Sequence, residues 1–530
     1  MSSVNEPVRT SDPEGAAPAT SLEDGPAPSE GAHEVGEHVA LAASLVVFGA
    51  TGDLAHRKLY PALASLASRG HLPARLTVVG TARAHLSDEE FAEEVRAAVE
   101  KAGGTPAHGN PLEQRGVRFR FVSGSVDDPG TCARLRDVLE EADAEHGRVG
   151  NVLYYLATVP RVFGTIANRI GEVGLAEEPP GTFRRCIVEK PFGRDLASAR
   201  ELDEELHRHF REHQIFRIDH YLAKETVQNI LALRFTNTIF EPLWNRRYVD
   251  RVEITVAEEL GVEHRGAFYE QAGVLRDIVQ NHVLQVLALT AMEPPASFAA
   301  NAIRDEKVKL LRSVRPLELP EIPARVVRGQ YGAGTVDGVE VRAYRDEPDV
   351  SPQSTVETYL ALRLDVDNWR WAGVPFYVRA GKRLQHRATR VALRYKQVPF
   401  LPLPARAVDS VEPNTMCLHI QPDEGISLSF AAKVPGQTFR VRTVPLDFRY
   451  GETFAEQAPE AYERVLLDAF LGDATLFIRA DEVDTAWRLV QPLIDAFERD
   501  ALPLATYEAG SWGPHEAEAL LASRWWEEKA

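Results

Sequence analysis

The stretch that most restricts the fold lies near the N-terminus, where a short apolar run, Leu45–Phe48, leads into GATGDLAHRKLYPAL at 49–63. The run predicts a β-strand that ends in a glycine-rich turn, and the residues after the turn predict an amphipathic helix. A second short strand is predicted at Leu76–Val79. Because a strand, a helix and a second strand form a βαβ unit, the chain is expected to open with an α/β domain.

The strand pattern continues to about residue 215 and then changes. Three more strands, separated by helical stretches such as 130–144, are predicted at Val117–Val122, Val152–Ala157 and Cys186–Glu189. This alternation predicts a doubly wound parallel sheet within residues 41–215. Beyond residue 250, strands without intervening helices predict a large, mainly antiparallel sheet, with members at Val252–Val256, Val339–Tyr344, Tyr359–Asp365, Pro375–Arg379, Arg390–Tyr395, Met416–Gln421 and Ile426–Ala431. With helices at about 270–291, 459–471 and 481–499, residues 216–530 are expected to form an α+β domain.

Composition excludes several classes of protein. A formal net charge of -18 argues against binding to nucleic acid or to an anionic membrane, since both need a basic surface. Neither a membrane span nor a secretory signal is predicted. Three widely spaced cysteines, Cys132, Cys186 and Cys417, predict neither a disulfide framework nor a metal site, so a cytoplasmic location is expected. Residues 1–40 are rich in Pro, Gly, Ala, Ser and Glu and are expected to be disordered.

The glycine-rich turn suggests a nucleotide site. Gly49, Gly52 and Ala55 have a G-x-x-G-x-x-A spacing, a variant of the dinucleotide fingerprint in which small residues let a pyrophosphate approach a helix N-terminus. The alternative is a tight strand-to-helix connection without a ligand. Arg83 follows the second strand, where an enzyme that prefers NAD places an acid, and a guanidinium there would pair with a 2′-phosphate. NADP is therefore favoured over NAD.

A second candidate site is the stretch FRIDHYLAKETVQNILALRF at 216–235. It places Asp219, His220, Tyr221 and Lys224 at the start of an apolar helix. In a helix, His220 and Lys224 would share a face and suit an anion such as a phosphate. The alternative is that Asp219 is an N-cap and the rest a solvated first turn.

Lys190 stands in EKPFG, directly after a predicted strand of the parallel sheet. Ligands in such sheets bind beyond the carboxyl ends of the strands, so Lys190 could reach a substrate or cofactor. The alternative is an ordinary solvated lysine.

Together these motifs resemble the glucose-6-phosphate dehydrogenase family. The resemblance runs from about Leu45 to the last helix and is carried by GATGDLAHRKLYPAL at 49–63, VGTAR at 79–83, IVEKPFGRDL at 187–196, RIDHYLAKETVQNILALRF at 217–235, GVLRDIVQNHVLQVLALTAMEPP at 273–295, RDEKVKLL at 304–311, GVPFYVRAGKRL at 373–384 and PEAYERVLLDAFLGDATLFIRADEVDTAWRLVQPL at 459–493. It implies a Rossmann-like NADP-binding domain followed by a substrate-binding and oligomerisation domain. The implied reaction oxidises the C1 hydroxyl of glucose 6-phosphate to a lactone and passes hydride to NADP, the first step of the oxidative pentose phosphate pathway.

The resemblance also implies catalytic roles. His282 is the expected base that removes the C1 hydroxyl proton, and Asp219 is the carboxylate that orients it. Lys190 is expected between nicotinamide and sugar, and Pro191 resembles the family's cis-proline. Asp277 lies five residues before His282, about 140° around a regular helix, so it is expected to act separately on sugar hydroxyls.

Binding roles follow from the same resemblance. The expected phosphate ligands are His220, Tyr221, Lys224, Lys382 and Arg387, and the expected sugar ligands are Glu258, Asp277 and Gln421. The expected cofactor ligands are Gly49, Ala50, Thr51, Gly52, Asp53, Leu54, Arg83 and Lys190. Some members hold a second NADP on the antiparallel sheet, but His419 and Ala388 stand where that site uses basic residues, so none is predicted here.

Three alternatives and one expectation about assembly accompany the main hypothesis. The chain could be a catalytically silent sugar-phosphate or dinucleotide sensor of the same fold. It could also be an enzyme that uses NAD, or one that acts on another hexose 6-phosphate. A homodimer or homotetramer is expected from the resemblance alone.

Overall fold

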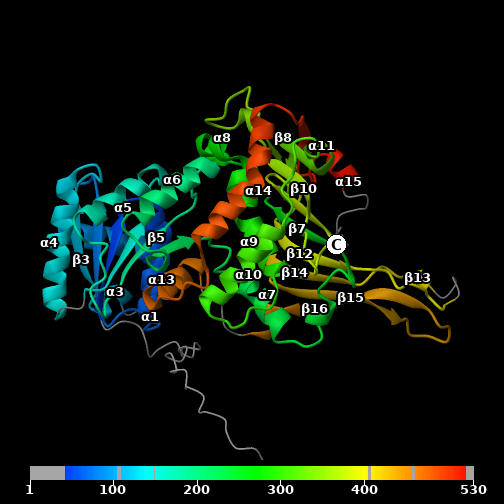
Figure 1. Ribbon diagram of the computed structural model, residues 1–530, viewed down its shortest axis with the longest axis horizontal. Coiled ribbons are helices and arrows are strands. Elements are labelled where there is room, and N and C mark those ends of the chain that lie inside the picture. Colours follow the sequence, from blue (N-terminus) through cyan, green and yellow to red (C-terminus); the bar gives the residue numbers. More distant parts are fainter. Residues whose placement is uncertain (1–41, 104–108, 148–149, 404–407, 455–459, 521–530) are drawn as a thin grey trace, which may run out of the picture.

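The computed structural model describes residues 42–103, 109–147, 150–403, 408–454 and 460–520, so the segment predicted to be disordered, 1–40, lies outside the described residues. Two sheets lie toward opposite ends of an elongated molecule, with a layer of helices between them (Figure 1). This arrangement confirms the predicted fold class, an α/β part followed by an α+β part with a large sheet.

The N-terminal sheet has seven strands in the order β17-β6-β5-β4-β1-β2-β3. Their bounds are β1 Ala42–Phe48, β2 Arg75–Ala82, β3 Arg118–Ser123, β4 Val152–Leu156, β5 Arg184–Val188, β6 Ile215–Ile218 and β17 Phe477–Ile478. β1 to β6 pair in parallel, as predicted, and the order turns back beside β1, which lies between β2 and β4. Ligands of such sheets bind at this switch point. β17 comes from near the C-terminus and pairs antiparallel with β6.

Helices connect the parallel strands. They are the π-helix η1 Ala55–Leu59, α1 Tyr60–Ser68, α2 Asp88–Lys101, α3 Pro111–Gln114, α4 Pro129–His146, η2 Pro160–Val162, α5 Phe163–Glu172, α6 Leu196–His207 and η3 Glu212–Gln214. The α2 helix has a capping box made by Ser87 and Glu90, and α4 ends at Gly147 with φ 83°. These start and stop signals are local, so the sequence alone sets where these two helices begin or end.

The C-terminal sheet has eleven strands and is mainly antiparallel, as predicted. The bounds are β7 Val249–Ala257, β8 Val326–Val336, β9 Val339–Val341, β10 Tyr359–Asp365, β11 Pro375–Gly381, β12 Ala388–Tyr395, β13 Val408–Ser410, β14 Thr415–Gln421, β15 Gly425–Lys433, β16 Val441–Arg449 and β18 Leu504–Ala509. The order is β13-β16-β15-β14-β12-β7-β11-β10-β8-β18, with β9 paired to β8. Three neighbouring pairs are parallel: β7 with β11, β8 with β18, and β13 with β16.

The C-terminal helices pack mostly between the two sheets (Figure 1). They are α7 Glu225–Phe235, η4 Glu241–Leu243, η5 Glu263–Arg265, α8 Gly266–Val274, the π-helix η6 Leu275–Val283, α9 Leu284–Ala291, α10 Ala300–Ser313, α11 Ile322–Arg325, η7 Tyr344–Asp346, α12 Tyr450–Thr453, α13 Ala461–Leu471, α14 Ala480–Glu498 and α15 Glu516–Leu520. The α14 helix packs on both α6 and η6, and so joins the two parts of the chain. No helix among the described residues combines the length and apolar character needed to cross a bilayer.

Candidate active site

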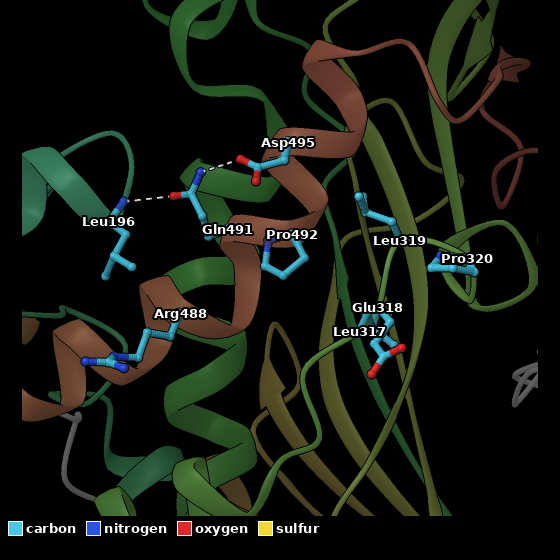
Figure 2. A pocket seen from close by; sticks show the side chains of 9 residues that line it. All are labelled: Leu196, Leu317, Glu318, Leu319, Pro320, Arg488, Gln491, Pro492 and Asp495. Atoms are coloured by element: carbon cyan, nitrogen blue, oxygen red, sulfur yellow. Dashed lines mark hydrogen bonds between the residues drawn. The ribbon is translucent and has the colours of Figure 1, made fainter.

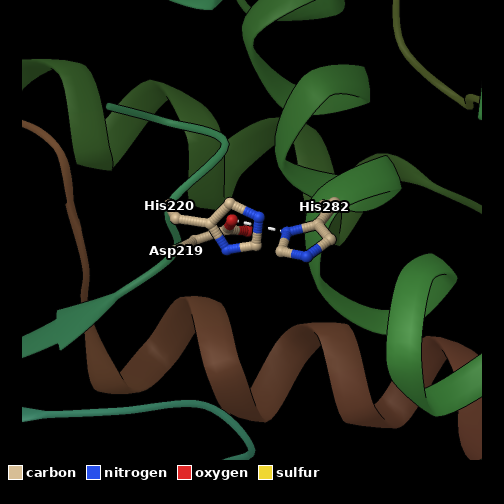
Figure 3. Close-up of side chains that lie close together, drawn as sticks. All are labelled: Asp219, His220 and His282. Atoms are coloured by element: carbon tan, nitrogen blue, oxygen red, sulfur yellow. Dashed lines mark hydrogen bonds and ion pairs between the residues drawn. The ribbon is translucent and has the colours of Figure 1, made fainter. Parts of the chain in front are cut away.

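Three segments that are distant in the sequence meet between the two sheets. Asp219 follows β6, Lys190 follows β5, and His282 lies in η6. Figure 3 shows the Asp219 carboxylate pointing toward the His282 ring, with His220 beside both. Because β5 and β6 are parallel neighbours, their carboxyl ends bring Lys190 and Asp219 to the same edge of the sheet.

His282 is held through both ring nitrogens. Its Nδ1 lies 2.5 Å from Asp219 Oδ1, and its Nε2 lies 3.0 Å from Lys190 Nζ. The side chains of His282 and Asp219 are only 2% and 1% exposed. The carboxylate can only accept, so Nδ1 carries the proton and Nε2 has the free electron pair. This is the tautomer that a general base needs.

Burial sets the charge state of this group. Burial lowers the pKa of His282, and the charge of Asp219 only partly opposes that shift. Burial also raises the pKa of Asp219, but the hydrogen bonds that its carboxylate accepts from His282 and from the Tyr221 amide help to hold this pKa below its usual range. A neutral imidazole therefore faces an ionised carboxylate at neutral pH. Proton transfer to Nε2 would create an imidazolium directly beside that negative charge.

The relation between Asp277 and His282 corrects one sequence expectation. A regular helix would separate them, but η6 is a π-helix, whose i→i+5 hydrogen bonds bring residues five apart to the same side. Lys190 Nζ donates to the Asp277 carbonyl at 2.7 Å and lies 3.4 Å from its Oδ1. The same ammonium reaches His282. Asp277 is thus part of one cluster with Lys190 and His282, and the prediction of separate faces is wrong.

The segment that carries His220 and Lys224 corrects the expectation that these two residues share a helix face. The α7 helix begins only at Glu225, so His220 and Lys224 lie in the preceding turns and not on one helix. The N-cap alternative for Asp219 is also wrong, because the N-cap position of α7 is Lys224, five residues further on. The sequence pattern missed β6, which ends one residue before Asp219 and directs its side chain.

Gln421, at the end of β14, contacts three of the residues expected to bind phosphate. Its Oε1 accepts from Lys224 Nζ and, at 3.2 Å, from Arg387 Nη2. Its Nε2 lies 3.4 Å from the Tyr221 hydroxyl. Burial and the charge of Arg387 lower the pKa of Lys224 to about 8. Two cations therefore share one neutral oxygen, an arrangement that a dianion would stabilise.

His220 and Lys382 have different surroundings. Burial lowers the pKa of His220 to about 3, so its imidazole is neutral and can bind an anion only as a hydrogen-bond donor. Lys382 Nζ donates to the Glu258 carboxylate. Lys382 follows β11 and Glu258 follows β7, and these two strands are parallel neighbours. The structure thus brings together a phosphate candidate and a sugar candidate, and the grouping of Lys382 with Lys224 stays a prediction.

The predicted cofactor turn lies at the switch point of the N-terminal sheet. Gly49 has φ 86°, donates its N–H to the Thr81 carbonyl at 2.9 Å, and has no room for a side chain because a Cβ would lie 2.3 Å from the Ala157 oxygen. The buried Ala50 accepts from the Tyr60 hydroxyl at 2.6 Å. Thr51, Gly52, Asp53 and Leu54 complete the turn and lead into the helix that continues through η1 and α1. A bare backbone at a helix N-terminus fits a pyrophosphate.

Arg83 lies just beyond β2, the neighbour of β1, and is exposed. This position leaves its guanidinium accessible to a ligand on the turn.

Two groups of potential metal ligands lie close together among the described residues. One is Asp219, His220 and His282, and the other is Asp203, His207 and Glu212. Each group already contacts a cation. Lys190 lies at His282 of the first group, and Arg217 donates to both Asp203 and Glu212 of the second. This competition disfavours a metal at either place.

Sequence reasoning missed two polar contacts beside the site. The Glu189 carboxylate accepts from the Tyr155 hydroxyl at 2.6 Å, next to Lys190. Thr389 Oγ1 accepts from Gln421 Nε2 at 3.0 Å. The motif EKPFG contains Glu189, but its partner is 34 residues away, and nothing in the local sequence marks Thr389. The structure also gives the Lys190–Pro191 peptide as cis.

Comparison with known proteins agrees with the motifs. The family model described as glucose-6-phosphate dehydrogenase, NAD binding domain, matches residues 46–229, and the one described as glucose-6-phosphate dehydrogenase, C-terminal domain, matches residues 231–527. Glucose-6-phosphate 1-dehydrogenase of Aggregatibacter actinomycetemcomitans is 48% identical over 478 residues, which cover 90% of this chain and 95% of the relative. Glucose-6-phosphate 1-dehydrogenase 2 of Mycobacterium tuberculosis (strain ATCC 25618 / H37Rv) is 46% identical over 477 residues, covering 90% and 92%.

Solved structures give the same result. A glucose-6-phosphate dehydrogenase in complex with its substrate glucose-6-phosphate is similar with a TM-score of 0.84 and 35% identity, covering 93% of this chain and 100% of the other. The enzyme from Mycobacterium avium is similar with a TM-score of 0.79 and 37% identity, covering 93% and 99%.

Proposed function

The chain belongs to the glucose-6-phosphate dehydrogenase family, and from this premise we propose how its own residues carry out the reaction. The protein oxidises the C1 hydroxyl of D-glucose 6-phosphate to 6-phospho-D-glucono-1,5-lactone. The observation that carries the mechanism is the hydrogen-bonded line Asp219–His282–Lys190, in which Asp219 and His282 are buried and Lys190 is partly exposed. A silent sensor needs no such base, and nothing in the site favours that alternative.

In the proposed mechanism, His282 Nε2 accepts the proton of the C1 hydroxyl. Asp219 holds Nδ1 protonated and stabilises the imidazolium that forms. Lys190 Nζ lies at the same Nε2, so a hydroxyl that binds there lies beside both the base and an ammonium. The ammonium stabilises negative charge that develops on the C1 oxygen.

Substrate orientation rests on the opposite end of the site. Lys224, Arg387 and Tyr221, gathered at Gln421, are the proposed phosphate ligands, with His220 as a neutral donor. Lys382, which donates to Glu258, is proposed as a further phosphate ligand, and Glu258 and Asp277 are proposed to bind the sugar. Remote binding of the dianion fixes the position of C1 against His282, which lowers the entropic part of the barrier.

NADP is the proposed cofactor, with NAD as a weaker substitute. Bound nicotinamide supplies the hydride acceptor. The residues proposed to hold the dinucleotide are those of the turn Gly49–Leu54, with Arg83 on the 2′-phosphate and Lys190 near the nicotinamide. The support is the tight glycine backbone and the exposed guanidinium one strand away.

We also propose a homodimer or homotetramer that assembles through the large sheet. The support is a set of exposed apolar side chains on its outer strands, including Phe430 of β15 and Leu446 of β16. Light scattering on the purified protein tests this. A cytoplasmic location also stays a prediction, which agrees with the three buried, free cysteines.

The test of the proposed function is reduction of NADP by glucose 6-phosphate in wild type and in His282→Asn. We expect turnover to fall by about 10²–10⁴-fold in the variant because the general base is lost. His146→Asn is a matched control, since His146 is also buried and bonds Thr77 Oγ1 at 2.9 Å in the N-terminal sheet, away from the site. Equal turnover in wild type and His282→Asn would contradict the proposed role of the base.

A further inference from the structure

The loop that follows Lys190 is attached to the C-terminal part of the chain, chiefly to α14. Trp487 Nε1 donates to the Phe192 carbonyl at 2.8 Å, and Gln491 Oε1 accepts from the Leu196 amide at 3.0 Å. Trp487 and Gln491 are four residues apart in α14, so they lie on one face of the helix. Figure 2 shows the Gln491 side chain directed at Leu196.

The Gln491 amide has a fixed orientation. Its Nε2 donates to Asp495 Oδ1 at 2.7 Å, one helical turn further on (Figure 2). A carboxylate can only accept, so the nitrogen must face Asp495 and the oxygen must face the Leu196 amide. Asp495 thus makes Gln491 a dedicated acceptor for the start of α6.

A third attachment comes from the segment that carries the base. Arg276 Nε donates to the Arg194 carbonyl at 2.7 Å, and Arg276 lies in η6 directly before Asp277. The loop is therefore held at residues 192, 194 and 196, while the Lys190 ammonium on its other side contacts Asp277 and His282. β5 ends at Val188, so the strand itself does not fix the backbone at Lys190.

We propose that Trp487 and Gln491, here called the α14 clamp, are positioning residues for Lys190 that set where its ammonium meets His282 Nε2. The inference rests on the proposed function. A lysine ammonium is a point charge on a flexible stem, so it keeps one position only when its backbone and its contacts are both fixed. Trp487 is 1% exposed, and its indole and the Gln491 amide bond the loop backbone and not Lys190. The clamp acts through the loop.

Displacement of Lys190 should change the pH dependence of the reaction, whereas a simple loss of stability should not. The charged and titratable groups that face the His282 ring are Asp219, Lys190, His220, Asp277 and Tyr221, whose ring stacks on the imidazole with centroids 4.1 Å apart. The positive charge of Lys190 lowers the pKa of His282. If Lys190 moves away, this pKa rises, and because only neutral His282 is a base, the acid limb of the kcat/KM profile moves to higher pH.

The first test is Gln491→Met, which removes the acceptor at nearly constant volume, and Trp487→Phe, which removes the indole donor. We expect kcat to fall by about 10–100-fold, since small misplacements of reacting groups cost up to about 100-fold, with KM for glucose 6-phosphate changed less than about threefold. We also expect the acid limb to move to higher pH in both variants.

The control is Trp371→Phe. Trp371 is 0% exposed and donates its indole N–H at 2.7 Å to the carbonyl of Ala291, which lies at the end of α9 and not in the loop at 192–196. It loses the same kind of hydrogen bond, so it should lose similar stability and keep the wild-type pH profile.

A rescue variant adds a second readout. Gln491→Glu alone keeps an acceptor for the Leu196 amide but places its other oxygen against the Asp495 carboxylate, and this repulsion should displace the side chain. In the double variant Gln491→Glu/Asp495→Asn, the new amide at 495 donates to that oxygen instead. The double variant should regain most of the kcat lost in Gln491→Glu and the wild-type acid limb.

Three outcomes are decisive. Folded Gln491→Met and Trp487→Phe with wild-type kcat and acid limb would overturn the clamp, and so would a loss of melting temperature alone. If Gln491→Met does not fold, Trp487→Phe and the double variant decide by the same criteria. An inactive wild type, or an active His282→Asn, would instead overturn the proposed function, whereas failure of the clamp leaves both of those results intact.

Discussion

Replacing Asp219 with Asn should reduce turnover strongly while leaving substrate binding almost unchanged. The side chain is 1% exposed and accepts from His282 Nδ1 at 2.5 Å. Asn is nearly isosteric and keeps a hydrogen-bonding oxygen, so the fold should persist. What disappears is the negative charge beside the imidazolium that forms when His282 takes the proton.

The size of the effect follows from that lost charge. Two unit charges with centres about 4 Å apart attract by about 4 kcal/mol at an effective dielectric constant of about 20. Since about 1.4 kcal/mol corresponds to a factor of ten, kcat should fall by about 10³-fold. KM should change by less than about threefold, because binding precedes the formation of this charge.

The pH profile gives an independent test, because the direction in which its acid limb moves can be predicted. The charge of Asp219 raises the pKa of His282 against the lowering effect of burial. In Asp219→Asn this pKa should therefore fall further, so the acid limb of kcat/KM should move to lower pH although the rate itself is reduced. This shift is opposite to the one expected for the α14 clamp variants.

The assay is steady-state formation of reduced nicotinamide with glucose 6-phosphate across pH. A matched control is Asp468→Asn, another buried aspartate, which pairs with Arg464 at 3.0 Å in α13. The Asp468→Asn variant should be less stable than the wild type but should keep its turnover. The reasoning is refuted if Asp219→Asn retains kcat within about threefold, which is far from the expected loss, or if its acid limb moves to higher pH.

Three further predictions concern binding and stability. Lys224→Met should raise KM for glucose 6-phosphate by about 10–100-fold, the value of one charge-assisted hydrogen bond, with a smaller effect on kcat in the same assay. Arg83→Ala should raise KM for NADP much more than KM for NAD, and an equal effect would exclude a contact with the 2′-phosphate. Hydrogen bonds to Asp203 and Glu212 raise the pKa of His207 from 6.5 to about 10. Its contribution to stability should be complete below pH 6.5 and be lost as pH rises through about 10, so urea titrations of His207→Asn should lack that loss.

Much of the fold was predictable because it depends on local signals. Five of the six parallel strands and the turn at Gly49 follow from short apolar runs and glycine punctuation. β17 was not predictable, since Phe477–Ile478 is two residues long and becomes a strand only by pairing with β6. β8 contains Gly329, Gly332 and Gly334, which hide its strand pattern, and it is defined by its neighbours β10 and β18.

The site shows the same division. The sequence by itself determined which residue types are present, because RIDHYLAKE, EKPFG and DIVQNH carry several carboxylates, two imidazoles and two ammonium groups whatever the packing. Only the tertiary structure decided how they are grouped. It placed Asp219 against His282 across 63 residues, brought Asp277 to the same side as His282 through a π-helix, and put Lys382 on Glu258.

The physical reason is the distance over which each effect acts. Strand and turn preferences depend on a few neighbouring residues, so they can be read from a short stretch. A π-helix register, a neutral buried imidazole and a loop held by α14 depend on partners distant in sequence and on exclusion of water. Those conditions exist only after both sheets have packed against the helices between them.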